Sequence, residues 1–110
     1  MLYTRAEDFF KNAAKQQRLS LREEKACAQK MKEGDALARQ ALFDSFLPLL
    51  AAFLKRWSDA PSLELIYRGL AVLEKELAAF DFQGEDPSFD RHLSAKLRQM
   101  MTSYIADRPR

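Results

Sequence analysis

The sequence is short of the residues that turns, disulfides and metal sites require. Three glycines and four prolines in 110 residues leave too few breaks for an architecture of many strands and turns. The one cysteine, Cys27, excludes a disulfide within the chain and favours a reducing cytoplasm. Since His92 is the one histidine, a structural zinc site would need unusual ligands. We therefore expect no metal and no cofactor.

Export and membrane signals are also missing. The chain starts with acidic residues in its first eight positions, where a signal peptide needs an apolar run. The longest apolar stretch, Phe46 to Leu54, contains Pro48 and is too short to span a bilayer. We expect a cytoplasmic protein that is neither exported nor membrane-spanning.

Catalytic groups are scarce. His92 is the one side chain whose ordinary pKa makes it a base at neutral pH, and Cys27 is predicted on the buried side of a helix, where a thiol is usually inert. The sequence has no glycine-rich phosphate loop and no zincin or calcium-loop motif. The acids Asp81, Glu85 and Asp86 could bind a cation, but a solvated loop is the more common arrangement. The sequence does not predict an enzyme.

What remains predicts a folded, all-helical domain. Hydrophobic residues make up 47% of the chain and charged residues 31%, and 110 residues suffice for one domain. Apolar positions recur at helical spacing, and no segment alternates as a half-buried strand would. The pattern predicts a compact all-α bundle of about five helices. The predicted helix starts are Thr4 and Ser20, each in a capping box with an acid three residues later, followed by Asp35, Ser62 and Ser88.

Apolar stripes identify the expected core. The second helix carries Ala26, Cys27 and Met31 and ends near Gly34. The third is one long helix up to Trp57, and because Pro48 removes a backbone donor inside it, we expect a kink there. The apolar stripe of the first helix is Phe9, Phe10, Ala13 and Ala14, and that of the third is Leu42, Phe46, Leu49, Leu50, Phe53, Leu54 and Trp57. The stripe of the fourth helix is Leu63, Ile66, Leu70, Leu73, Leu77 and Phe80. The stripe of the fifth is Phe89, Leu93, Leu97, Met100, Met101 and Tyr104.

Charge is more informative by region than in total. The net charge is +2, but residues 1–58 carry 11 basic and 7 acidic side chains, residues 59–90 carry 2 and 8, and residues 91–110 carry 5 and 1. A basic last helix thus follows an acidic fourth one. This indicates either mutual attraction between the two helices or an anion-binding helix beside a surface for a basic or mixed partner.

The last helix has a polar face that suits nucleic acid. With its apolar side turned inward, His92, Ala95, Gln99 and Thr102 face outward. The flanking side chains are Arg91, Lys96 and Arg98. Glutamine can bind adenine edges, and arginine or lysine can bind phosphate or guanine. The same pattern also fits an ordinary solvated face.

A set of short segments occurs in order over roughly residues 19–107. These segments are Leu19-Ser-x-x-Glu23-Glu24, Met31-Lys-Glu-Gly34-Asp35-x-x-Ala38-Arg39-x-x-Leu42, Leu47-Pro-Leu-Leu50, Lys55-Arg56-Trp57, Leu65-Ile66-x-x-Gly69, Ala79-Phe80-Asp81, Phe89 and Arg98-Gln99-Met-Met-Thr102-x-x-Ile105-Ala106-Asp107. In this order and spacing they resemble the conserved core, region 2, of sigma-70 family RNA polymerase sigma factors.

The resemblance implies an all-helical domain at residues 19–110. We expect residues 1–18 to form an N-terminal helix that packs on this core. It implies that residues 62–77 bind a coiled coil in the largest subunit of RNA polymerase core, through Glu64, Tyr67, Arg68 and Glu74. It further implies that residues 88–106 contact the minus-ten element of promoter DNA. The implied DNA-binding residues are Phe89, Arg91, His92, Lys96, Arg98, Gln99 and Thr102.

The chain departs from the family pattern in three ways. His92, Ala95 and Lys96 stand where the family has the aromatic side chains that melt promoter DNA, and Tyr67-Arg68-Gly69 replaces Gln-Glu-Gly in the polymerase-binding helix. The helix-turn-helix domain that reads the minus-thirty-five element is not in this sequence. Two hypotheses follow. The first is a sigma factor core, either a fragment or one chain of a split factor that has a separate helix-turn-helix partner. The second is a helical interaction module that does not act on DNA, such as a decoy, an anti-sigma partner or a mobile-element regulator.

Overall fold

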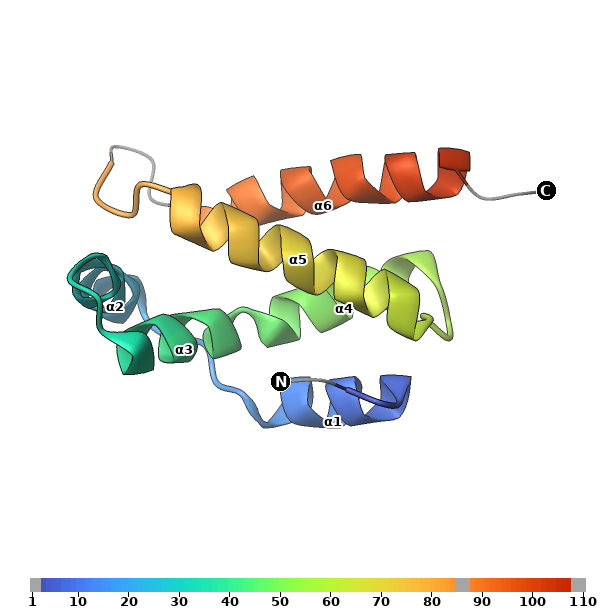
Figure 1. Cartoon of the computed structure of the whole chain (residues 1–110), viewed down its shortest axis with the longest axis horizontal. Coiled ribbons are helices and arrows are strands. Elements are labelled where there is room, and N and C mark those ends of the chain that lie inside the picture. Colours follow the sequence, from blue (N-terminus) through green and yellow to red (C-terminus); the bar gives the residue numbers. More distant parts are fainter. Residues whose placement is uncertain (1–2, 85–87, 108–110) are drawn as a thin grey trace.

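Six helices and no strand occur over residues 3–84 and 88–107, the part of the chain that the computed structural model describes (Figure 1). The all-α prediction is confirmed. The helices are α1 (Ala6–Lys15), α2 (Leu21–Lys32), α3 (Ala36–Ser45), α4 (Leu47–Trp57), α5 (Leu63–Ala79) and α6 (Phe89–Asp107).

The bundle is layered. Figure 1 shows α5 and α6 running antiparallel as one layer, with α3 and α4 following each other end to end beneath them and α1 below α4. Helix α2 packs mainly on α3 and lies at one end of the molecule. The principal extents are 45 × 27 × 21 Å. Helix α6 is thus at the outer edge of the bundle, with one side free to face solvent.

Short polar side chains cap most helices where the sequence predicts. The capping box of α2 is complete, because the Glu23 N–H donates to Ser20 Oγ at 3.1 Å and the Ser20 N–H donates to the Glu23 carboxylate at 2.9 Å. These hydrogen bonds, the backbone one first, lower the pKa of Glu23. Asp35 and Ser62 accept from backbone N–H groups at 3.0 and 3.1 Å, and Ser88 accepts from the Arg91 N–H at 3.4 Å.

The predicted capping box at Thr4 is wrong. The residue at the N-cap of α1 is Arg5, and no side chain caps this helix. The carboxylate of Glu7, which a box starting at Thr4 would need, instead forms an ion pair with the Arg5 guanidinium. An exposed pair of opposite charges has taken the place of the reciprocal hydrogen bonds.

The predicted third helix is divided at Phe46 rather than kinked at Pro48. Helix α3 ends as Ser45 Oγ donates to the Leu42 carbonyl at 2.7 Å and the Phe46 N–H donates to the Phe43 carbonyl at 3.1 Å. Pro48 then lies in the first turn of α4. In a first turn the missing N–H costs no helical hydrogen bond, so proline starts this helix instead of bending it.

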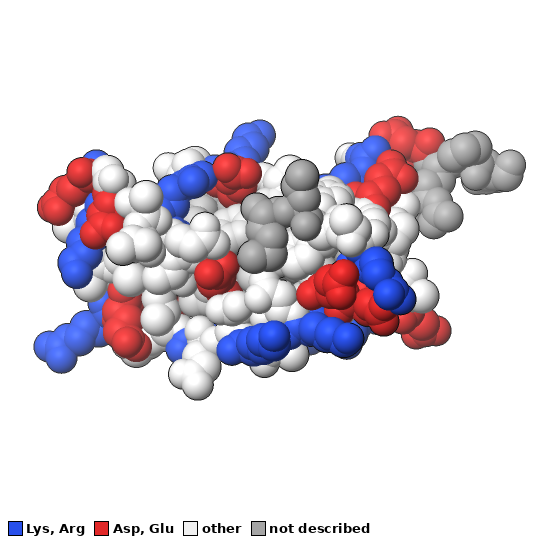
Figure 2. All heavy atoms as spheres, turned by 60° about the horizontal axis from the view of Figure 1, so that its bottom comes forward, with Lys and Arg blue, Asp and Glu red and all other residues white. Residues whose placement is uncertain are grey.

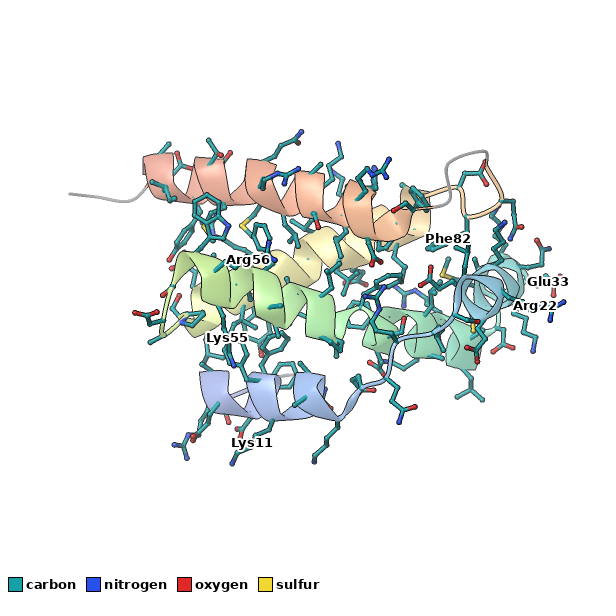
Figure 3. The ribbon with its side chains drawn as sticks, turned by 180° about the vertical axis from the view of Figure 1, so that it is seen from behind. Lys11, Arg22, Glu33, Lys55, Arg56 and Phe82 are labelled. Atoms are coloured by element: carbon teal, nitrogen blue, oxygen red, sulfur yellow. The ribbon has the colours of Figure 1, made fainter. Side chains whose placement is uncertain are left out.

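Taken together, Ala36–Trp57 is the one span within the described residues that is long and apolar enough to cross a membrane, by length and composition alone. Core helices of soluble proteins meet the same criterion. In this fold α4 lies between α1 and the α5–α6 layer (Figure 3), and the side chains of Leu42, Phe46 and Leu50 are fully buried. Of the most apolar 18-residue window of this span, 44% is buried inside the bundle.

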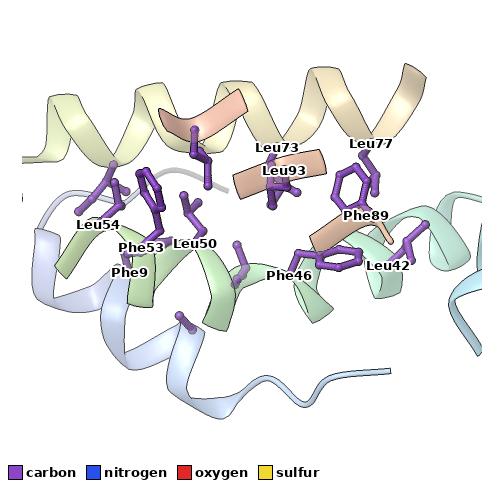
Figure 4. Packing of buried hydrophobic residues seen from close by; sticks show 14 of the residues in the cluster. Phe9, Leu42, Phe46, Leu50, Phe53, Leu54, Leu73, Leu77, Phe89 and Leu93 are labelled. Carbon is purple, nitrogen blue, oxygen red and sulfur yellow. The ribbon is translucent and has the colours of Figure 1, made fainter. Parts of the chain in front are cut away.

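One continuous core joins the layers (Figure 4). Near the start of α6, the rings of Phe46, Phe80 and Phe82 surround the ring of Phe89. The Phe46 and Phe80 ring centroids lie 4.7 and 5.1 Å from that of Phe89. Where α5 crosses α4, a Cβ on Gly69 would lie 2.8 Å from a Leu50 methyl, so a larger residue at position 69 would require the Leu50 side chain to shift. The fully buried large side chains include Phe9, Leu42, Phe46, Leu47, Leu50, Leu54, Ile66, Leu73, Leu77, Phe82, Phe89, Leu93 and Leu97.

A charged cluster connects α2 to the start of α6. Arg18 donates two hydrogen bonds to the Asp90 carboxylate, at 2.6 and 2.7 Å, and lies 3.9 Å from the carboxylate of Glu24. The Glu24 side chain is 7% exposed, and desolvation raises its pKa, with Asp90 adding to the rise and Arg18 opposing it. In α2 it is Glu24 and Ala28 that are buried, whereas Ala26 is exposed.

Candidate functional site

The outer face of α6 carries exposed polar and basic side chains. Arg98, Gln99 and Thr102 are all exposed, on the side of the helix opposite buried Leu93, Leu97 and Met101. Arg91 is exposed two to three turns before them, and Lys96 is half-buried at the edge of the face. The structure therefore brings five of the predicted DNA-contacting residues onto one accessible helix surface, which we call the α6 outer face.

Hydrogen bonding leaves part of this face uncommitted. Within residues 3–84 and 88–107, the side chains of Arg98 and Gln99 have no hydrogen-bond or ion-pair partner. The Thr102 hydroxyl donates to the Arg98 carbonyl at 3.0 Å, so its hydrogen is used within the helix. Gln99 can offer a donor and an acceptor to one base edge, Arg98 can bind phosphate or guanine, and Thr102 can offer its oxygen lone pairs and its methyl group.

Phe89 belongs to the core and not to this face. Its side chain is 1% exposed and packs against Phe46, Phe80 and Phe82. A ring enclosed by three others has no surface to stack on a base. In this structure the Phe89 side chain therefore has no exposed surface, and its predicted contact with DNA stays a prediction.

His92 is turned toward α5. Its Nε2 lies 2.8 Å from the Glu76 carboxylate, and its ring centroid is 5.1 Å from that of Phe80. About a third of the side chain is exposed. The sequence analysis placed His92 outward, but an acceptor and an aromatic ring on the neighbouring helix hold it between α5 and α6, so its Nε2 is committed within the fold.

The residues predicted to bind polymerase lie along α5 but do not form one surface. The Tyr67 hydroxyl donates to the Tyr3 carbonyl at 2.7 Å and accepts from the Tyr3 N–H, which fastens the segment before α1 onto α5. Glu74 accepts from Arg39 of α3 at 3.0 Å. Tyr67 and Glu74 thus face α1 and α3.

The other two residues of that set face elsewhere. The Arg68 guanidinium lies 3.5 Å from the Glu64 carboxylate, one turn earlier on α5, and 5.2 Å from the centroid of the Tyr104 ring of α6. Both Glu64 and Arg68 are exposed. This pair borders the α6 side of the bundle.

A cleft of about 410 Å³ opens between α3, α5 and the N-terminal segment. From the N-terminal side Tyr3 and Asn12 line it, from α3 Arg39 and Asp44. From α5 the lining side chains are Tyr67, Leu70, Ala71 and Glu74. Viewed from the side of α1, acidic and basic side chains are interspersed and surround uncharged surface (Figure 2). We call the cleft between α3, α5 and the N-terminal segment the α5 cleft.

Sequence reasoning missed the α3 and N-terminal walls of the α5 cleft. Tyr3 and Tyr67 are 64 positions apart and Arg39 and Glu74 are 35 apart. No local pattern predicts such pairs, since the sequence around each residue carries no sign of its distant partner. Part of the acidic loop considered as a cation site, Glu85 and Asp86, lies outside the described residues, and within them no cluster of three or more metal-binding side chains occurs.

A search of curated proteins finds similarity to a sigma factor. The RNA polymerase sigma factor SigA of Clostridium acetobutylicum is 34% identical over 104 residues, which are 93% of this chain and 27% of that protein. The chain is thus distantly similar to one part of a sigma factor. It spans about a quarter of the length of this curated relative. No family model matches the chain, and no solved structure matches it.

Proposed function

We propose that this chain is a cytoplasmic, non-enzymatic transcription initiation factor of the sigma-70 type, corresponding to region 2. In this proposal α5 binds the coiled coil of the largest subunit of RNA polymerase core, and the α6 outer face contacts the minus-ten element of promoter DNA. The chain acts either as part of a longer sigma factor or together with a separate helix-turn-helix chain. The observation that carries the proposal is the exposure of Arg98, Gln99 and Thr102 on one helix face, in a chain similar to SigA.

The chemistry of the face supports contact with duplex DNA. Gln99 would bind an adenine edge through its amide, and Arg98, Arg91 and Lys96 would lie against the phosphates on either side. The nearest acid on the helix, Asp90, is already paired with Arg18, so it does not cancel these positive charges at full strength. An exposed amide suited to base recognition and basic side chains suited to phosphate support the proposal.

Strand opening is a different matter. A base stacked on an aromatic side chain gains about 1–3 kcal/mol. Phe89 is enclosed in the core and the nearby surface positions hold Ala95 and Lys96, so this part of α6 has no exposed aromatic platform. We therefore propose duplex binding without melting by this chain alone. The lack of an exposed aromatic platform on this part of α6 also favours the second candidate, a helical interaction module on a sigma-like scaffold that does not act on DNA.

Salt dependence of DNA binding separates the two candidates. A fluorescein-labelled minus-ten duplex is titrated with the chain at several salt concentrations, and the dissociation constant is read from anisotropy. If about four phosphates are contacted, log affinity falls against log salt with a slope of roughly −3 to −4. A flat response, or no binding at low salt, contradicts the proposal and favours the interaction module.

Polymerase binding is tested separately by co-purification of the tagged chain with RNA polymerase core. The proposal requires that wild-type chain retain the core enzyme and that the charge reversal Arg68→Glu weaken the complex, because reversing a charge at a docking surface disrupts its electrostatic fit. Retention that is unchanged in Arg68→Glu counts against docking through the Glu64–Arg68 side of α5.

A further inference from the structure

Helix α2 and the segment before it are fastened to the α5–α6 end of the bundle at the surface. The helix packs mainly on α3 and lies at the end of the molecule where the loop that carries Phe82 also lies (Figure 3). Arg18, just before α2, binds the Asp90 carboxylate of α6 at 2.6 and 2.7 Å. The side-chain amide of Gln83 donates to the Lys25 carbonyl at 3.1 Å. Both contacts involve exposed groups.

A cleft of about 360 Å³ lies where α2 meets the start of α6. Leu19 and Glu24 line it from the side of α2, and Phe89 lines it from α6. The Arg18 guanidinium also lines the cleft and lies 5.4 Å from the centroid of the buried Phe46 ring. A single side chain therefore joins the segment before α2 to the core and to the first turn of α6.

The forces that hold α2 in this position are small or opposed. The side chains of Arg18 and Asp90 are 41% and 43% exposed, and exposed ion pairs add little stability and are screened by salt. Burial raises the pKa of the Glu24 carboxyl, so at neutral pH the closed position acts against the ionised group. The residues of α2 that are buried are Glu24 and Ala28, a carboxylate and a small side chain. Little apolar burial therefore opposes the release of this helix.

The turn after α2 allows a change of angle. Gly34 joins α2 to α3 with a φ of 91°, a left-handed conformation that glycine adopts readily. A Cβ at this position would meet no atom within 4 Å, so packing around Gly34 does not restrict the turn.

We propose that α2 is a lid over the start of α6, held closed by the Arg18–Asp90 ion pair and released when anions or salt screen that pair. The closed lid covers the side of Phe89 that lines the cleft, and the open lid makes it accessible. The α6 outer face is exposed in both states. The lid controls access to the start of α6, whichever partner the chain binds.

Cys27 reports the position of the lid, because it is the one thiol of the chain and lies half-buried on α2. Its alkylation by iodoacetamide, a neutral reagent, is followed by mass spectrometry at constant pH. The salt concentrations are about 0.05 M and about 1 M NaCl, which leave the ion pair weakly and strongly screened. We expect wild type to react about two- to fivefold faster at high salt, the range that the loss of an exposed ion pair gives.

Variants of the ion pair test the same claim without salt. Arg18→Gln and Asp90→Asn should each react at low salt as fast as wild type does at high salt, and should lose the salt dependence. Arg39→Gln is the matched control, because it removes another exposed arginine from an ion pair, with Glu74, that lies between α3 and α5. This control should behave as wild type. Glu24→Gln should react more slowly than wild type, because closing the lid no longer buries a charge.

Amide hydrogen exchange separates opening of the lid from a general loss of stability. In Arg18→Gln, exchange should rise in residues 21–32 and stay at the wild-type level in residues 63–79. Equal increases in both helices, equal alkylation rates in Arg18→Gln and Arg39→Gln, or a wild-type rate that does not change with salt would each overturn the lid. Each of these results leaves the proposed function standing, since DNA and polymerase binding are measured separately.

Discussion

The two longest helices, α5 and α6, differ in how many of their surface polar side chains bond to other parts of the fold. On α5, Tyr67 is hydrogen-bonded to the N-terminal segment, Glu74 to α3 and Glu76 to His92 of α6. On the α6 outer face, Arg98 and Gln99 have no such partner among the described residues. The surface of α5 is part of the architecture, whereas the outer face of α6 is not needed to hold the bundle together.

This difference decides how mutations should be interpreted. A substitution on α5 that weakens binding also removes a contact within the fold, so it requires a stability measurement beside it. A substitution on the α6 outer face should act on binding alone, because exposed positions without partners usually change stability by less than about 0.5 kcal/mol. The following predictions test this separation.

The largest effect is expected on the inner side of α6. Phe89→Ala leaves a cavity between Phe46, Phe80 and Phe82 and should lower the free energy of unfolding by about 3–5 kcal/mol. Urea unfolding followed by circular dichroism measures it. Unchanged stability together with a loss of DNA binding would restore the original assignment of Phe89 as a DNA contact.

On the outer face of the same helix, Arg98→Ala should reduce affinity for the minus-ten duplex by about tenfold or more and make the salt slope less steep by about 1, with stability unchanged. Lys75→Ala, which removes an exposed cation from α5, is the matched control and should leave DNA affinity near wild type. Equal losses in the two variants would mean that net charge alone governs binding.

On α5, Tyr67→Phe removes the hydroxyl that both donates to and accepts from the Tyr3 backbone. The expected loss in free energy of unfolding is about 0.5–1.5 kcal/mol for such hydrogen bonds. Denaturant unfolding gives the value, and amide hydrogen exchange in residues 3–15 should rise with it. Wild-type exchange in that segment would show that the N-terminal wall is held by its apolar contacts instead.

The smallest effect concerns pH. Because the pKa of Glu24 is raised in the folded protein, the folded state binds its proton more tightly than the unfolded state, and stability falls as pH rises above the ordinary glutamate pKa of about 4.3. Glu24→Gln removes that fall. As the pH rises from 5 to 7.5, the free energy of unfolding of the variant should therefore increase relative to that of wild type.

Glu23→Gln is the control of opposite sign. The pKa of Glu23 is lowered, so its carboxylate stabilises the folded state above the ordinary pKa, and that stabilisation disappears as pH falls. This variant should be less stable than wild type at pH 7.5 and approach it in acid. Urea unfolding at pH 7.5, pH 5 and pH 3.5 measures both variants, and parallel pH profiles for Glu24→Gln and wild type would contradict the account of Glu24.

Local signals predicted much of the fold. Ser20, Asp35 and Ser62 cap helices as expected, because a cap depends on three or four neighbouring residues. Pro48 was misjudged, since the same residue bends a helix interior and starts a new helix, and the choice depends on where Ser45 and Phe46 end α3.

The candidate site was predictable in part for the same reason. Periodicity places Arg98, Gln99 and Thr102 outward without any knowledge of neighbours. It cannot show that Glu76 and Phe80 hold His92 inward, nor that Tyr3 meets Tyr67 across 64 positions. Those outcomes depend on which helices become neighbours, which a pattern within one helix does not contain.

Base discrimination by Gln99 tests the central claim most directly. Duplexes that carry each single base-pair change in the minus-ten element compete against the labelled parent for wild type, Gln99→Ala and the Lys75→Ala control. If the α6 outer face reads bases, wild type and control discriminate at one or two adjacent positions by about tenfold or more, and Gln99→Ala loses that discrimination there. The same competition profile for Gln99→Ala and wild type would contradict the account.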